Sequence, residues 1–257
     1  MESTTLLHIA SLISTGALVG LAVGLTGVGG GSLMTPALIS IFGVAPAIAV
    51  GTDLAFAAAT KSAGVVAHRN SGAIVWPIVG LMIAGSTPAC LLALWVMHGK
   101  PAGSSAELIK TTLGIALLAT ALAVLLKGKI KAVPIHSKST KTVLTLVLSA
   151  LIGWLVAWSS IGAGAVGCTV LALIYGELEP RDIAATDIAY AVPLTAIAAT
   201  GHALQGNIDW TLLLCLLVGS VPAIWFGVRL SARLSQGVAR GLLATLLATA
   251  AIKALSF

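Results

Sequence analysis

The sequence predicts an all-α protein that crosses a membrane several times and consists of two related units of about five helical segments each. Mean hydropathy is +1.07 and only 9% of the 257 residues are charged, whereas about a quarter of the residues of a soluble domain are charged. Apolar runs recur along the whole length, and the two halves resemble each other. The composition leaves no room for a separate soluble domain.

Eight apolar runs have the ~20 residues that a membrane-spanning helix needs. They cover residues 5–26, 46–68, 73–97, 106–126, 142–161, 182–203, 208–229 and 238–256. Two shorter runs, 31–43 and 164–175, follow glycine-rich stretches and have the length of re-entrant or half-helical segments. The start of the chain, MESTTLLHIA, has no positive segment before its apolar run. We therefore expect the first run to remain as a span rather than to be cleaved as a signal peptide.

Residues of rare type recur along the chain at a constant spacing of 134 positions. The pairs are Thr52-Asp53 with Thr186-Asp187, His68 with His202, Trp76 with Trp210, Gly85-Ser86 with Gly219-Ser220, and Pro88 with Pro222. At a spacing of 133, Gly20, Gly29 and Gly31 correspond to Gly153, Gly162 and Gly164. We interpret the chain as a first repeat (1–126), a linker (127–141) and a second repeat (142–257).

Charge predicts how the two repeats are oriented. The linker contains Lys127, Lys129, Lys131, Lys138 and Lys141. The positive-inside rule makes this loop cytoplasmic, and it does the same for the arginine-containing stretch 229–240. An even number of crossings must separate the two loops, so the segments 142–161 and 164–175 must enter the membrane and return. Each repeat then has an odd number of segments, and the second repeat is inverted relative to the first.

This topology predicts a multi-pass protein of the cell inner membrane, with both termini external. It also accounts for the sequence pI of 9.5, so we expect no nucleic-acid partner. Trp76 and Trp210 fit an interfacial aromatic belt. We expect His68 and His202 to cap helix ends or to bond to backbone rather than to titrate during transport.

The stretch Gly29-Gly30-Gly31-Ser32 interrupts an apolar region. Glycine costs about 1 kcal/mol per helix position, and a broken helix is tolerated in lipid only where it lines a cavity or packs on protein. Ser32 can cap a new helix start, which can hold an anion. The second repeat has a matching break from Ser159 to Gly164, and inversion would bring the two helix starts together near the midplane. Close helix packing is the alternative explanation of these glycines.

Three ionisable residues lie inside predicted spans. Asp53 and Asp187 are expected to bind protons or a coupling cation, because carboxylates within the membrane usually face a cavity. The alternative is stabilisation by a nearby helix dipole. Lys61 is in a position to attract an anion or neutralise a carboxylate, or to extend along the helices towards the interface. The second repeat has Thr195 in place of Lys61, so the predicted site is asymmetric.

Four stretches resemble the sulfite exporter TauE/SafE family of membrane transporters: GLTGVGGGSLMTPAL, AVGTDL, AHRNSGAIVW and its second-half counterpart GHALQGNIDW. The resemblance covers nearly the whole chain and implies export of sulfite, of sulfonates such as sulfoacetate, or of related small anions. Two features depart from the family. The second motif, IGAGAVGCTVL, lacks the third glycine and the proline. Asp53 and Asp187 stand where the family often has serine, which suits an anion site only if the carboxylates are protonated or ion-paired.

The combined prediction is a secondary transporter of a small sulfur anion, with alternating access at a midplane site and proton coupling through Asp53 and Asp187. The predicted substrate-binding residues are Gly29, Gly30, Gly31, Ser32, Thr52, Lys61, Ser159, Ser160, Gly162, Gly164 and Thr186. No cofactor or metal is expected, and association into a homodimer is left open. One alternative is a cation or metal transporter that uses Asp53, Asp187 and Cys168. Another is an intramembrane aspartyl protease, although such enzymes resemble Gly-x-Gly-Asp and this chain has Gly-Thr-Asp.

Overall fold

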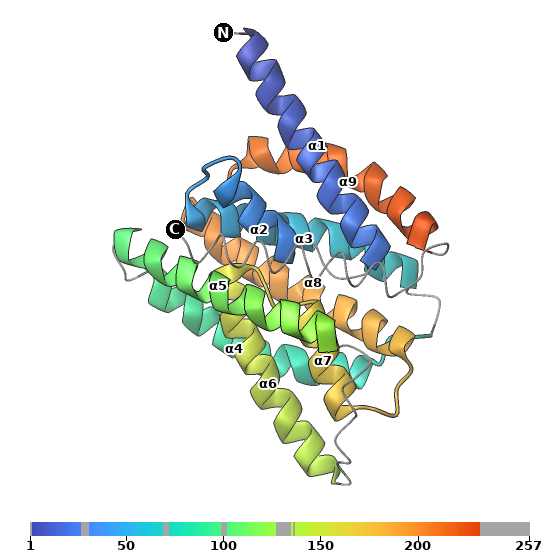
Figure 1. The fold of residues 1–257 in the computed structure, drawn as a ribbon. Helices are drawn as coiled ribbons and strands as arrows, with labels where there is room; N and C mark the ends of the chain where they lie inside the picture. Colours follow the sequence, from blue (N-terminus) through green and yellow to red (C-terminus); the bar gives the residue numbers. More distant parts are fainter. Residues whose placement is uncertain are drawn as a thin grey trace.

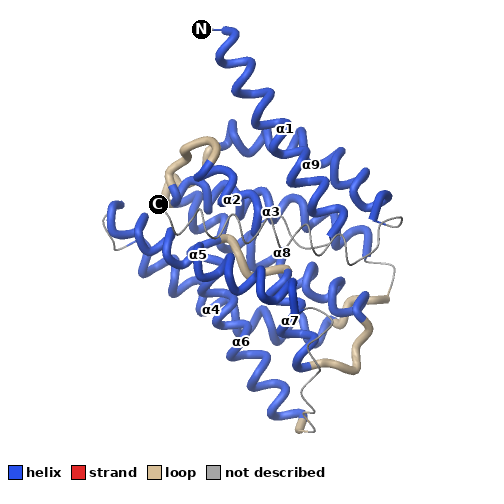
Figure 2. The backbone as a smooth tube through the Cα atoms, viewed as in Figure 1, coloured by secondary structure: helices blue, strands red, loops and turns tan. Residues whose placement is uncertain are grey.

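The computed structural model describes residues 2–26, 31–68, 72–98, 102–126, 135 and 137–231. Within these residues the chain is helical and has no strand (Figures 1 and 2). The helices are α1 (Glu2–Thr26), α2 (Gly31–Ser40), α3 (Pro46–His68), α4 (Trp76–His98), α5 (Ala102–Leu126), α6 (Lys138–Ser159), α7 (Ala165–Ile174), α8 (Pro180–Leu204) and α9 (Trp210–Ser231). The predicted run 238–256 and most of the lysine-rich linker lie outside the described residues.

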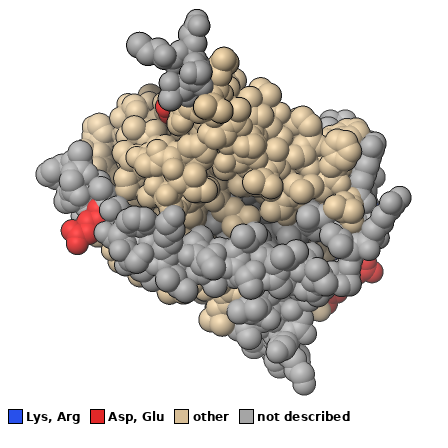
Figure 3. Space-filling model, turned by 45° about the horizontal axis from the view of Figure 1, so that its top comes forward, with Lys and Arg blue, Asp and Glu red and all other residues tan. Residues whose placement is uncertain are grey.

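Five of these helices are long and apolar enough to cross a membrane. The candidate spans are Leu6–Val23, Trp76–His98, Lys138–Ser159, Pro180–Leu204 and Trp210–Gly227. The predicted all-α, multi-span fold class is therefore confirmed, and the predicted runs agree closely with the observed helices. Figure 3 shows a face on which the described side chains are almost all uncharged, as a surface in contact with lipid requires.

Glycines allow two pairs of helices to cross in close backbone contact. In the pair formed by α1 and α9, the Gly20 backbone lies against Ser220. In the pair formed by α4 and α6, the Gly153 backbone lies against Ser86. A side chain at either glycine would collide with the facing helix, which is the usual function of small residues between membrane helices. Each pair joins a helix from one half of the chain to a helix from the other.

The short helices α2 and α7 each turn back beside the helix that precedes them. Phe42, just after α2, stacks edge-on against His8 near the start of α1, with 5.8 Å between ring centroids. Tyr175, just after α7, lies under Lys141 near the start of α6, with 5.4 Å from Nζ to the ring centroid. The α1–α2 and α6–α7 segments are therefore helical hairpins, and within each hairpin the start of the first helix lies beside the end of the second.

The central helices α3 and α8 pack against each other in opposite directions. Gly51, near the start of α3, lies against His202 and Asn207 at the end of α8. Two reciprocal hydrogen bonds join these helices to the starts of α9 and α4. Thr52 Oγ1 accepts the Asp209 N–H at 3.1 Å, and Thr186 Oγ1 accepts the Val75 N–H at 3.0 Å.

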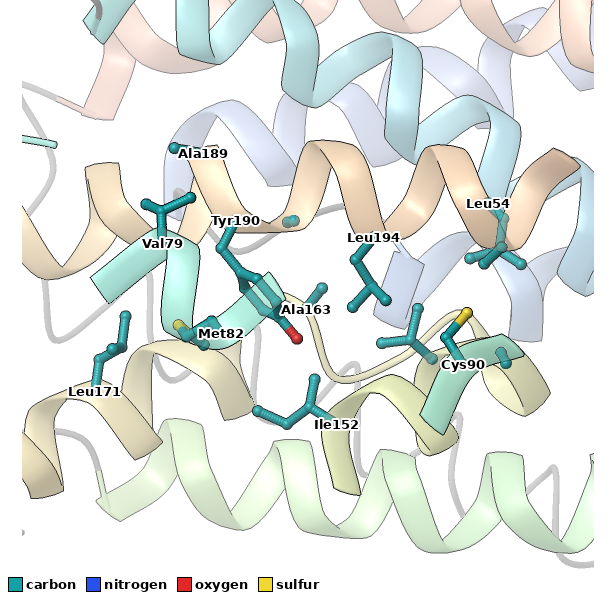
Figure 4. Close-up of a cluster of buried hydrophobic side chains, with 14 of the residues drawn as sticks. Leu54, Val79, Met82, Cys90, Ile152, Ala163, Leu171, Ala189, Tyr190 and Leu194 are labelled. Atoms are coloured by element: carbon teal, nitrogen blue, oxygen red, sulfur yellow. The ribbon is translucent and has the colours of Figure 1, made fainter. Parts of the chain in front are cut away.

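The main apolar core surrounds this helix pair. Tyr190 and Leu194 of α8 pack with Met82 and Cys90 of α4 and with Ile152 of α6 (Figure 4). This core fixes α8, and with it the ionisable residues of α8, at the centre of the protein.

Replacing Gly85 by alanine should lower the thermal stability of the detergent-solubilised protein. A Cβ at this position of α4 would collide with Leu146 and Ser149 of α6, and overpacking of this kind costs about 1–3 kcal/mol. Gly80→Ala in the same helix is the matched control, because no atom beyond the neighbouring backbone of α4 lies within 4 Å of the added Cβ. Thermal unfolding should separate the two variants. Equal midpoints would contradict the proposed close packing of α4 on α6.

The Lys141–Glu177 ion pair at the base of the second hairpin, 2.5 Å long, should make a small, pH-dependent contribution to stability. The hydrogen bond from Lys141 lowers the pKa of Glu177 below its usual value. The contribution is therefore complete at neutral pH and is lost as the pH falls through the folded-state pKa. Because Glu177 is 60% exposed, we expect the ion pair to contribute less than about 1 kcal/mol to the free energy of unfolding.

Thermal unfolding of Glu177→Gln at neutral and acidic pH measures this contribution. The difference from the unsubstituted protein should be present at pH 7 and should shrink below about pH 4. Glu179→Gln is the control, because the Glu179 side chain makes no capping hydrogen bond to α8. A constant difference at both pH values would show that the ion pair does not cause it.

Candidate functional site

The break between α6 and α7 has a backbone that explains its composition. Ser160 has φ 60°, and Gly162 and Gly164 have φ 129° and 149°, values that glycine adopts without the steric cost paid by other residues. Ser160 is the only non-glycine residue with positive φ in the part of the chain that the structure describes. The Ser159 hydroxyl donates to Leu155 O at 2.7 Å and accepts the Ile161 N–H at 3.2 Å. The break is therefore an ordered, buried turn from which α7 starts.

The break before α2 is described only from α2 onwards. Gly31 is the first residue of α2, whereas Gly29 and Gly30 lie outside the described residues, as does the side chain of Ser32. The predicted cap at Ser32 and its predicted contact with an anion therefore remain predictions.

Asp53 joins three parts of the protein. Its carboxylate is fully buried, and Oδ2 accepts hydrogen bonds from the Thr35 N–H at 3.2 Å and the Thr35 hydroxyl at 2.5 Å. The Ser160 hydroxyl also lies beside Asp53, outside strict hydrogen-bond geometry. Asp53 Oδ1 and Ser160 Oγ have no hydrogen-bond partner among the described residues. The Asp53 carboxylate of α3 thus contacts α2 and faces the break between α6 and α7.

Asp187 has a similar position relative to α7. The side chain is 2% exposed, and its Oδ1 lies so close to Gly167, in the first turn of α7, that a Cβ there would collide with it. The start of a helix has a partial positive charge, which stabilises a nearby carboxylate. Gly167 is therefore required for this approach of Asp187 to α7.

Lys61 connects the two carboxylates to the break. Its side chain is 8% exposed, and Nζ donates to Ala163 O at 2.5 Å. The charge also interacts electrostatically with Asp187, Cys168 and Asp53. The side chain therefore points into the protein rather than along it towards the interface, and the first half of the chain binds the break of the second half through Lys61.

The structure brings together one group of the predicted site residues: Lys61, Asp53, Asp187 and the break from Ser159 to Gly164. Thr52 and Thr186 have another observed contact, because their hydroxyl oxygens accept the backbone N–H groups that precede α9 and α4. Their part in substrate binding stays a prediction. His202 is buried and bonds through Nε2 to Ala157 O at 3.0 Å, which is the expected bond to backbone.

Sequence reasoning missed two contacts of the carboxylates. Thr35 was not singled out, although Thr169 follows it by 134 residues, and this repetition is the signal that was available. Gly167 corresponds to Leu33, so the repeat pattern gave no indication of its contact with Asp187.

Metal-ligating side chains do not gather at this site. The described residues contain no group of three or more His, Cys, Asp or Glu side chains that could hold a metal ion. First-row transition metals favour imidazole and thiolate ligands. The charges in the break are those of one lysine and two aspartates.

Comparison with known proteins identifies a family of membrane transporters. The family model described as "Sulfite exporter TauE/SafE" matches residues 12–254. "Probable membrane transporter protein YjnA" of Bacillus subtilis (strain 168) is 34% identical over 236 residues, which cover 88% of this chain and 91% of that protein. A "Probable membrane transporter protein" of Xylella fastidiosa (strain 9a5c) is 30% identical over 233 residues, which cover 87% and 85%. No solved structure matches the chain.

The family model covers almost the entire sequence, and the similarity to these transporters extends over most of each chain. The helices supply several spans of the length that a bilayer requires. The chain therefore belongs to the sulfite exporter TauE/SafE family and is a multi-pass membrane transporter rather than an enzyme.

Proposed function

We propose that this protein is a secondary transporter that exports a small sulfur anion, such as sulfite or a sulfonate like sulfoacetate, in exchange for or together with protons. The observation that carries the proposal is the buried contact of Lys61 with the break at Ala163, beside Asp53 and Asp187. The family supports the chemical class of the substrate.

The charge balance around Lys61 supports the coupling to protons. One buried lysine faces two buried carboxylates, and burial of unbalanced charge is costly. An anion that enters this site adds a further negative charge. Protonation of a carboxylate compensates for it, so anion binding and proton binding favour each other. Asp53 can accept such a proton on Oδ1, which has no hydrogen-bond partner in the described part of the structure.

Pairs of equivalent contacts support two inverted repeats, residues 1–126 and 142–257, joined by the linker 127–141. Thr186 and Asp209 lie 134 positions after Thr52 and Val75, and the hydrogen bonds cross between them. The antiparallel packing of α3 and α8 is what inversion requires. The repeats would rock around the break to expose it alternately on each side, with the linker in the cytoplasm, both termini external and the protein in the inner membrane.

Flux through proteoliposomes tests the substrate class. Radiolabelled sulfite, sulfoacetate, taurine and sulfate would be compared with and without a pH gradient. We expect sulfite or sulfoacetate flux that a pH gradient accelerates. Divalent-cation flux without anion flux would favour a cation transporter that uses Asp53 and Asp187.

Replacing Asp53 by asparagine should abolish the response of anion flux to a pH gradient. Asparagine retains the shape of the side chain and an acceptor for Thr35 but does not titrate in the physiological range. Asp209→Asn is the matched control, because Asp209 accepts the Leu212 N–H at the start of α9 and asparagine caps helices equally well. A pH response that persists in Asp53→Asn would remove Asp53 from the coupling step.

Single cysteines at Trp76 and Trp210 should report the opposite orientation of the repeats. These residues begin α4 and α9 and are 58% and 61% exposed. In a background without Cys90, Cys168 and Cys215, a membrane-impermeant maleimide should label Trp210→Cys in intact cells. Trp76→Cys should react only after permeabilisation. Labelling of both from the same side would contradict the inversion.

A further inference from the structure

Tyr190 in α8 has a buried hydroxyl for which the structure provides no partner. Its side chain is the largest of those that are wholly buried. The hydroxyl has no hydrogen-bond partner among the described residues. Ser86 lies beside it, outside strict hydrogen-bond geometry. Native proteins seldom leave a buried donor unsatisfied, so an unsatisfied donor indicates a missing partner.

The position of Tyr190 links this donor to the break. Tyr190 follows Asp187 by three residues, so the two share a face of α8, and they interact electrostatically. Tyr190 also belongs to the same buried cluster as Ala163, and Figure 4 shows its ring directed from α8 towards Ala163 with the hydroxyl leading. Ala163 is the residue whose carbonyl binds Lys61.

A second buried hydroxyl without a partner belongs to the break itself. Ser160 is 4% exposed, and its Oγ has no hydrogen-bond partner among the described residues. The break thus has the Ser160 hydroxyl and the Lys61 cation, and Tyr190, in the same buried cluster as Ala163, adds a second neutral donor from α8. A ligand with several acceptor oxygens and a negative charge complements this set of donors.

Comparison of the two halves shows that the hydroxyl is not required for packing. The residue 134 positions before Tyr190 is Phe56, which is also fully buried, in a core formed with α1, α2 and α9. A phenyl ring therefore suffices at the equivalent position. At this pair of positions, a hydroxyl occurs only in the second half of the chain, which is the half whose break binds Lys61.

We propose that Tyr190 is a specificity-determining residue of this transporter, whose hydroxyl donates a hydrogen bond to one oxygen of a sulfur oxyanion held at the break 160–164. The inference rests on the proposed function and extends it. A site with both hydroxyls selects oxyanions that have at least two free acceptor oxygens, one for Tyr190 and another for Ser160. A site that hydrogen-bonds its substrate also rejects analogues without the acceptor.

Replacement of Tyr190 by phenylalanine tests this role by transport. Sulfite flux in proteoliposomes should show a KM raised about tenfold or more, as expected for the loss of one hydrogen bond to a charged group, with little change in thermal stability. Tyr175→Phe is the matched control, because the Tyr175 hydroxyl pairs with Thr145 at 2.9 Å, at the base of the hairpin. Its KM should be unchanged.

A spectroscopic measurement keeps the test valid if Tyr190→Phe folds poorly. The chain has only two tyrosines, so in Tyr175→Phe a 3-fluorotyrosine label reports Tyr190 alone. Its ¹⁹F resonance should shift saturably on addition of sulfite and should not shift with chloride at the same ionic strength.

The possible outcomes distinguish this inference from the function on which it rests. Sulfite flux with an unchanged KM in Tyr190→Phe, or a ¹⁹F resonance unaffected by saturating sulfite, would overturn the role of Tyr190 and leave the transporter intact. Absence of sulfite and sulfonate flux through the unsubstituted protein would overturn the proposed function, and the role of Tyr190 with it.

Discussion

The buried bond between Lys61 and the Ala163 carbonyl is the contact on which the central arrangement depends. A lysine inside a membrane protein is tolerated only with compensating partners. Here a backbone carbonyl accepts the hydrogen bond, and the charge interacts favourably with Asp187 and Asp53. The carbonyl is available because the helix is interrupted, and the interruption is stable because Gly162 and Gly164 adopt conformations that suit glycine. The charge, the break and the glycines therefore form one unit.

Contacts between the two halves of the chain position the unit formed by the Lys61 charge, the break and its glycines. The helix α1 packs on α9, and α6 packs on α4, so neither half can bury its glycine faces without the other. The threonine hydroxyls of α3 and α8 likewise accept backbone N–H groups that belong to the opposite half. These reciprocal contacts are the ones that the proposed alternating-access motion of the two halves would have to change.

The sequence allowed accurate prediction of whatever depends on local pattern. Runs of apolar residues identified the helices, because such runs are visible along a single chain, whereas the equivalence of positions 134 residues apart stays a prediction. Contacts between the halves could not be predicted in the same way. Thr52 and Thr186 were assigned to the substrate from their type alone, and only the folded chain shows that each accepts a backbone N–H. Tyr190 was overlooked because the repeat pairs it with phenylalanine, and the spacing highlights identities rather than differences.

The bases of the two hairpins hold together by different forces. His8 and Phe42 meet as two rings, whereas Lys141 binds both the Tyr175 ring and the Glu177 carboxylate. Dissolved salt screens interactions between exposed charges and has little effect on stacked rings. Ionic strength therefore acts on one end of the molecule and spares the other. Added salt should therefore lower the stability of only one of the two hairpins, and by no more than the small contribution of its ion pair.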